Sequence, residues 1–171
     1  GNEVVGLFTH GSHVYALTDG NSQSGLYKYD ISNISSPSFV SSVVIGNEFV
    51  DMAFDGTYIY IIDDTSDHLR IYNTSLSLIS SSLYLGTSLN YISDAKINEY
   101  NNILFISSSV SNKVSVINTK SKTTPLIEYT IVNGSEINSL LIKPFDVEVY
   151  QNYMYIPSNF HRELLISKSI G

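Results

Sequence analysis

Short segments in which apolar and polar residues alternate recur along the chain, separated by turn residues. A period of two is typical of β-strands that bury one face. The clearest segments carry an aromatic residue at a fixed place, at spacings of 45, 45 and 50 residues: Tyr15, Tyr60, Phe105 and Tyr155. We therefore predict four copies of one structural repeat.

Four short strands are predicted in each complete repeat. An apolar run precedes the aromatic strand, and a second alternating segment and a β-rich run follow it. A unit of this size cannot bury both faces of its sheet alone, so the copies must stack face to face. Radial stacking gives an all-β fold of the β-propeller class. We predict blades at approximately residues 1–46, 47–90, 91–138 and 139–171.

The blade count predicts a larger assembly. The 171 residues hold three complete blades and most of a fourth, whose outer strand has no counterpart in the sequence. Uncovered blade faces and unpaired strand edges favour association. We expect part of a larger propeller, completed by further blades or by other protein chains; the alternative is a four-bladed ring left partly open.

Composition narrows the classes of function. Charged residues make up 15% of the chain, the net charge is -7, and there is no cysteine. The negative charge disfavours nucleic-acid binding, which needs clustered cations. The lack of cysteine excludes disulfides and thiolate metal sites. No apolar stretch approaches the roughly 18 residues that a membrane span requires.

Two segments carry a family resemblance. Residues 103–123 (ILFISSSVSNKVSVINTKSKT) resemble the YVTN-type propeller repeat of archaeal and bacterial surface-layer proteins, and residues 26–37 (LYKYDISNISSP) resemble the LVIVD repeat. The resemblance implies a propeller fold and an extracellular or cell-surface location. The chain departs from the YVTN pattern where aspartates replace the usual glycine.

Those aspartates are the candidate metal ligands: Asp51, Asp94 and Asp146 align in the predicted innermost strands. The innermost strands of a propeller line its central channel. Three carboxylates at the same level along that channel could bind calcium, which takes several oxygen ligands. The alternative is structural, with each carboxylate accepting backbone hydrogen bonds from its own or the next blade. A repeated position favours the structural interpretation. We predict no cofactor, with calcium at these carboxylates as the alternative.

Other candidate chemistry is weak. The densest acidic cluster, Asp63, Asp64 and Asp67, lies in a turn, where aspartate is common. The four histidines have no metal-ligand spacing, and no nucleophile elbow is present. We predict no catalytic residue.

Three sequons mark Asn33, Asn73 and Asn133 as glycosylation acceptors if the protein is exported. All three fall at predicted strand ends, although chance accounts for their number. Tyrosines at the predicted rims are candidates for a sugar- or protein-binding surface: Tyr91, Tyr100 and Tyr129.

The sequence favours a non-enzymatic extracellular or cell-surface propeller. It would act as a structural or protein- and glycan-binding module in a surface layer, appendage, adhesin or virion. The alternative is a lactonase-like or quinoprotein-like enzyme with a metal or cofactor on the channel axis. The chain has no tryptophan, so it lacks the cofactor-stacking residue of quinoproteins.

Overall fold

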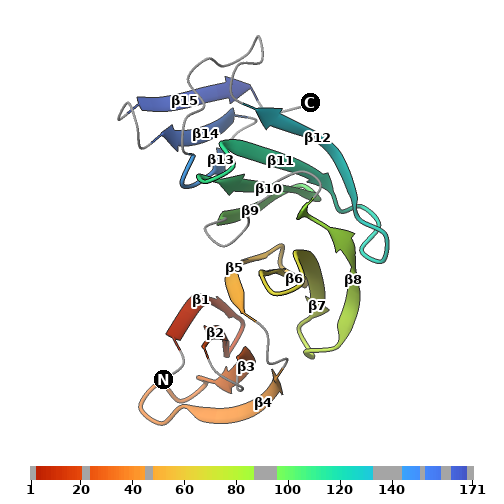
Figure 1. Cartoon of the computed structure of the whole chain (residues 1–171). Helices are drawn as coiled ribbons and strands as arrows, with labels where there is room; N and C mark the ends of the chain where they lie inside the picture. Colours follow the sequence, from red (N-terminus) through yellow and green to blue (C-terminus); the bar gives the residue numbers. More distant parts are fainter. Residues whose placement is uncertain are drawn as a thin grey trace.

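The computed structural model describes residues 3–20, 24–44, 48–86, 96–132, 144–150, 153–158 and 163–168. Its fifteen strands form four antiparallel sheets that follow one another in chain order. Figure 1 shows the sheets as the blades of an arc, with β4, β8 and β12 on the outer side. The predicted all-β class and the division into stacked blades are confirmed.

Each sheet is a meander in which strands pair with their neighbours in sequence. Blade 1 comprises β1 (Glu3–His10), β2 (His13–Asp19), β3 (Gly25–Asp30) and β4 (Ser38–Val44). Blade 2 comprises β5 (Phe49–Phe54), β6 (Tyr58–Asp63), β7 (His68–Asn73) and β8 (Leu78–Tyr84). Blade 3 comprises β9 (Lys96–Tyr100), β10 (Ile103–Ser108), β11 (Lys113–Asn118) and β12 (Leu126–Val132). In blade 4 the described strands are β13 (Glu148–Tyr150), β14 (Tyr153–Ser158) and β15 (Glu163–Lys168).

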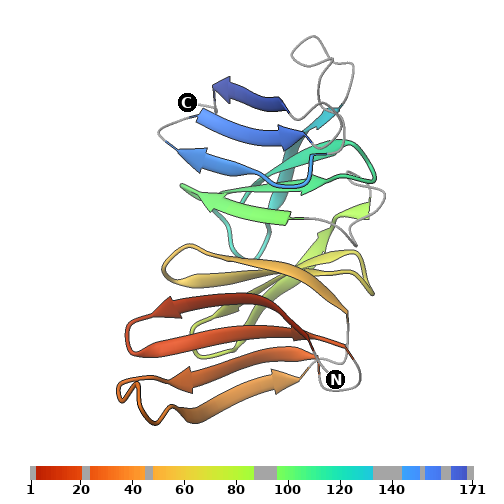
Figure 2. The ribbon, with the colours of Figure 1, turned by 90° about the vertical axis from the view of Figure 1, so that its left-hand side faces the viewer.

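The first strands of consecutive blades lie beside one another, so β1, β5, β9 and β13 line the inner side of the arc. Figure 2 shows the four sheets stacked one above another in chain order. Contacts between blades are therefore contacts between sheet faces, and we call each such face-to-face contact a seam.

The repeat register is confirmed by the aromatic residues. Tyr15, Tyr60, Phe105 and Tyr155 each occupy the third position of the second strand of their blade. The first three are at most 1% exposed, because each points into the seam with the following blade.

The hydrophobic core is divided among the seams. One cluster joins blades 1 and 2, another joins blades 2 and 3, and a third joins blades 3 and 4. Isoleucine, leucine and valine dominate these clusters, as expected for sheet faces that pack against each other. No helix in the described part of the chain is long and apolar enough to cross a membrane.

Candidate functional site

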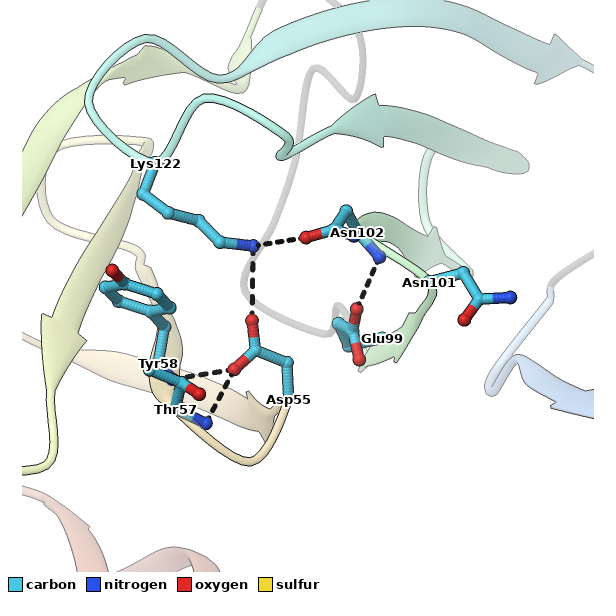
Figure 3. A pocket seen from close by; sticks show the side chains of 7 residues that line it. All are labelled: Asp55, Thr57, Tyr58, Glu99, Asn101, Asn102 and Lys122. Atoms are coloured by element: carbon cyan, nitrogen blue, oxygen red, sulfur yellow. Dashed lines mark hydrogen bonds and ion pairs between the residues drawn. The ribbon is translucent and has the colours of Figure 1, made fainter.

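A pocket of about 330 Å³ lies at the seam between blades 2 and 3. Three segments contribute to it: the β5–β6 turn, the end of β9 with the β9–β10 turn, and the loop between β11 and β12. Figure 3 shows the lining side chains, which are Asp55, Thr57, Tyr58, Glu99, Asn101, Asn102 and Lys122. Apart from the ring of Tyr58, these side chains are charged, amide or hydroxyl groups.

The two turns that shape the pocket follow from their sequences. Asp55 Oδ1 accepts hydrogen bonds from the backbone N–H groups of Thr57 at 2.8 Å and Tyr58 at 2.7 Å, an aspartate-stabilised turn. Across the seam, Asn101 and Asn102 both have positive φ, 53° and 64°. Two such residues in succession form the tight hairpin turn between antiparallel strands, and asparagine tolerates this conformation.

Lys122 reaches across the seam from blade 3 into blade 2. Its Nζ lies 3.1 Å from Asp55 Oδ2, 2.6 Å from the Tyr60 hydroxyl and 3.0 Å from Asn102 Oδ1. The ammonium also stands 5.4 Å from the Tyr58 ring centroid, within cation–π range. The side chains of Lys122 and Asp55 are only 13% and 11% exposed. This buried ion pair therefore fixes one wall of the pocket.

The protonation states of the pocket follow from its hydrogen bonds. Burial opposes ionisation of Asp55, but hydrogen bonds from the Tyr60 hydroxyl and the backbone of Tyr58 and Thr57 lower the pKa of the carboxyl overall. Burial and the hydrogen bond to Asp55 raise the pKa of Tyr60, so this hydroxyl stays protonated and donates to Asp55 at 2.6 Å.

Glu99 forms the opposite wall. Burial raises its pKa, and the nearby Asp55 carboxylate adds to that effect. The backbone N–H of Asn102 donates to Glu99 Oε1 at 2.8 Å and partly offsets it. The pocket thus holds fixed hydrogen-bond acceptors together with amide side chains that can both donate and accept.

The predicted ligand Asp51 is engaged by blade 3. Its Oδ2 accepts a hydrogen bond from the Ile97 backbone N–H at 3.2 Å and lies 3.8 Å from Lys96 Nζ. Burial raises the pKa of this carboxyl, against the favourable charge of Lys96. Asp51 thus accepts a backbone hydrogen bond from the next blade, the kind of contact that the structural alternative to a metal site describes.

The alignment of the three aspartates needs a correction. Met52 pairs with Ile61 and Ile97 pairs with Ile106, so Lys96 stands at the register of Asp51. The three aspartates were matched by residue type, although Asp94 lies eleven residues before its aromatic residue, Phe105, whereas Asp51 and Asp146 each lie nine residues before theirs. Asp94 itself lies outside the described residues.

Asp146 is exposed, and its Oδ1 accepts a hydrogen bond from the backbone N–H of Val147 at 2.8 Å. Among the described residues, no group of three histidine, aspartate or glutamate side chains is arranged to hold a metal ion.

In the acidic cluster, Asp63 is buried and binds Arg70, whose Nε and Nη2 both lie 2.6 Å from Oδ2. Ser66 donates to the same carboxylate through its backbone N–H and its hydroxyl. Asp63 therefore holds the β6–β7 hairpin together, as expected for an aspartate in a turn.

Among the described residues, no sequon asparagine and no rim tyrosine lines the pocket, although Tyr100 follows the lining residue Glu99 at the end of β9. Asn33 is exposed in the loop between β3 and β4. Asn73 ends β7, and its Oδ1 accepts hydrogen bonds from the backbone N–H groups of Ser75 and Ser77. Tyr129 is exposed on β12. Asn133 and Tyr91 lie outside the described residues.

The pocket was not predicted from the sequence. One signal was present: the residue before the first turn is histidine in blade 1 and tyrosine in blades 3 and 4, and only blade 2 has a carboxylate there, at Asp55. No pattern in the sequence connects Asp55 with Lys122, because their contact depends on how two blades stack.

Similarity to known proteins is found at the level of three-dimensional structure. No protein-family model matches the chain, and no curated protein sequence matches it. Solved structures do match. A functionally unknown protein from Desulfotomaculum acetoxidans has a TM-score of 0.68 at 13% identity, over 97% of this chain and 55% of the other. Hydrazine synthase from Kuenenia stuttgartiensis gives 0.65 at 12% identity, over 96% of this chain and 57% of that one.

The computationally designed Ika4 protein is similar over nearly its whole length. The match gives a TM-score of 0.65 at 8% identity and covers 98% of this chain and 92% of Ika4. The structures matched are β-propeller-like, and identities this low establish the fold alone. This chain is a β-propeller. It spans about half the length of the two natural proteins described above.

Proposed function

We propose that this propeller is a non-enzymatic interaction module of an extracellular or cell-surface protein, and that its seam pocket binds a hydroxyl-rich ligand such as a sugar unit. The observation that carries the proposal is the polar lining of the pocket. Glu99, Asn101 and Asn102 present carboxylate and amide groups from one short segment of blade 3. Sugar hydroxyls donate to such oxygens and accept from such amides.

The size of the pocket is consistent with a small ligand. Its volume of about 330 Å³ is at the lower end of the range of roughly 300–1,000 Å³ for small-molecule sites. It suits one sugar unit of a longer glycan whose remainder extends into solvent.

Binding fits the paired charges of Asp55 and Lys122 better than acid–base catalysis does. Asp55 and Lys122 are in mutual contact, and the lowered pKa of Asp55 keeps this carboxyl ionised near neutral pH. A general acid or base works best with a pKa near the working pH. The surface location rests on the resemblance of residues 103–123 to the YVTN repeats of surface-layer proteins.

The test is a titration of the isotope-labelled protein with single sugars, in which two-dimensional NMR measures binding. Neutral hexoses, N-acetylhexosamines and hexuronates form the panel. We expect one class to shift the backbone signals of the β9–β10 turn. Asn101→Ala should weaken that binding at least fivefold, whereas Ser12→Ala, in the corresponding turn of blade 1, should leave it unchanged.

A panel without any shift in these signals would overturn the sugar proposal, and so would equal binding by Asn101→Ala. The absorption spectrum of protein purified from its source tests the non-enzymatic assignment separately. A visible band from a bound cofactor would instead support the enzyme alternative.

A further inference from the structure

Both ends of the arc present apolar sheet faces. On blade 1, Leu7 is 65% exposed and Phe39 is 59% exposed, on the face turned away from blade 2. On blade 4, Tyr150 and Ile166 are 62% and 56% exposed, on the face turned away from blade 3. Contiguous apolar surface of this kind marks an interaction site.

The outer face of blade 1 repeats the positions that the seams bury elsewhere. The strand register makes Leu7 equivalent to Met52 and Ile97, since each pairs with the corresponding residue of the second strand. The second-strand partners at this row are Ala16, Ile61 and Ile106. In blades 2 and 3, this row packs against the preceding blade, and both isoleucine partners are fully buried. Blade 1 thus carries a seam face with no blade before it in the described structure.

The outer face of blade 4 carries the complementary positions. Tyr155 is equivalent to the aromatic residues that fill the seam toward the following blade. Ile166 pairs with it, as Ile71 pairs with Tyr60 and Val116 pairs with Phe105. Ile71 and Val116 are fully buried, whereas Ile166 is more than half exposed.

We propose that two copies of this chain associate head to tail, with the outer face of blade 4 in one copy stacked on the outer face of blade 1 in the other. The outer face of blade 4 is complementary to the outer face of blade 1 and not to a second copy of itself. Each seam therefore joins two different surfaces, which makes the contact heterologous. Two identical seams related by a two-fold axis close a ring of eight blades, within the range of about four to eight known for propellers. This pairing does not depend on the ligand of the seam pocket.

One polar contact of the existing seams extends to the new one. The Tyr15 hydroxyl donates to the backbone carbonyl of Thr74 in the following blade at 3.1 Å. The register makes Tyr155 equivalent to Tyr15, and Ile31 equivalent to Thr74 because Asp30 and Asn73 each end their third strand. The Tyr155 hydroxyl of one copy therefore faces the Ile31 carbonyl of the second.

The area is sufficient for a stable pair. A face of four strands, with about 4.8 Å between strands and 3.3 Å per residue, covers roughly 400 Å². The three described strands of blade 4 cover roughly 300 Å² by the same measure. Two seams bury two faces of each kind, or roughly 1,400 Å², within the range of about 1,200–2,000 Å² for specific interfaces.

Light scattering coupled to gel filtration tests the pairing with the 171-residue chain. We expect a discrete species of twice the chain mass of 19.0 kDa. Leu7→Glu and Ile166→Glu should each give monomers, because each charge lies in both seams of the ring. Ser81→Glu, on the exposed surface of β8, is the matched control and should stay dimeric. Far-UV circular dichroism and melting temperature verify that all variants fold.

Mixing the two monomeric variants distinguishes head-to-tail contact from other arrangements. Leu7→Glu keeps an intact blade 4 face and Ile166→Glu keeps an intact blade 1 face, so a mixed pair has one unaltered seam and one seam that carries both charges. An equimolar mixture should therefore regain part of the species of twice the chain mass, at a concentration where neither variant pairs alone. A wild-type monomer at 100 µM overturns the proposal. So do open filaments, loss of pairing by only one of the two variants, or a mixture that pairs no more than either variant alone.

Discussion

At the scale of single residues, Lys122 illustrates how one side chain joins two blades. Its ammonium contacts a carboxylate, a phenol and an amide from three different segments. A buried cation of this kind is stable only when its partners are in place. The pocket wall and the seam therefore depend on the same four side chains.

Asp55→Asn should lower the free energy of unfolding by about 2 kcal/mol at pH 7, because it leaves Lys122 without its counter-ion. The folded-state pKa of Asp55 lies below the ordinary value of 3.8, so the stabilisation from its ionised form is complete above that value. It is lost as the pH falls through the folded-state pKa. Urea unfolding of wild type and variant should therefore give a constant difference from pH 5 to 8 that shrinks below about pH 4.

Asp64→Asn is the matched control, with the opposite expectation. Burial and the neighbouring carboxylates of Asp67 and Glu48 raise the pKa of Asp64. Removal of this charge should leave the stability at pH 7 unchanged or slightly higher. A loss equal to that of Asp55→Asn would show that the ion pair is not the cause.

At the scale of strands, β3 and β4 approach so closely at Gly25 that a side chain does not fit. A Cβ at this position would meet the carbonyl oxygen of Val43 and lie 2.9 Å from the Cα of Val44. Both are backbone atoms, so the neighbouring strand would have to move. The glycine sets the spacing at the start of the outer hairpin of blade 1.

Gly25→Ala should therefore lower the free energy of unfolding by about 2 kcal/mol, the cost of overpacking a close contact. Gly11→Ala is the comparison, because its Cβ would meet open space and only the positive φ of 58° opposes it. We expect about 1 kcal/mol there. Thermal unfolding of both variants checks the order, and a greater loss for Gly11→Ala would contradict it.

The strands were the most predictable part of the molecule. Alternation and the spacing of Tyr15, Tyr60, Phe105 and Tyr155 indicate four equivalent strands, because one sheet face is buried in every copy. The bulge in β5 was not predictable from the alternating pattern. Asp94 was misaligned by two positions because it was matched by residue type and not by its spacing from Phe105. The pocket was not predictable either, because residues 67 apart along the chain, Asp55 and Lys122, meet only after the blades stack.

At the scale of the whole molecule, export and glycosylation remain predictions. Asn33 is exposed, whereas Asn73 is half-buried at the end of its strand. The carboxamide oxygen of each accepts backbone hydrogen bonds within its own turn. If the protein is exported, Asn33 should carry sugar more often than Asn73, because an exposed loop leaves room for the glycan.

Peptide mass spectrometry of protein purified from its source would measure this occupancy. The Asn33→Gln variant, expressed in the same host, should lose the corresponding mass. Unmodified asparagine at all three sequons, with Asn133 included, would favour an unexported protein or a host without this modification.

Because every strand pairs with its neighbours in sequence, the longest span within one sheet is a single repeat. A blade can therefore form as soon as its own segment leaves the ribosome, without waiting for distant residues. Short sequence separation between contacts favours fast folding, and repeat proteins can begin folding at any unit. The seams then form one after another, each new blade covering the apolar face of the blade before it. During synthesis, only the most recently made face would be open to misassembly with a neighbouring chain.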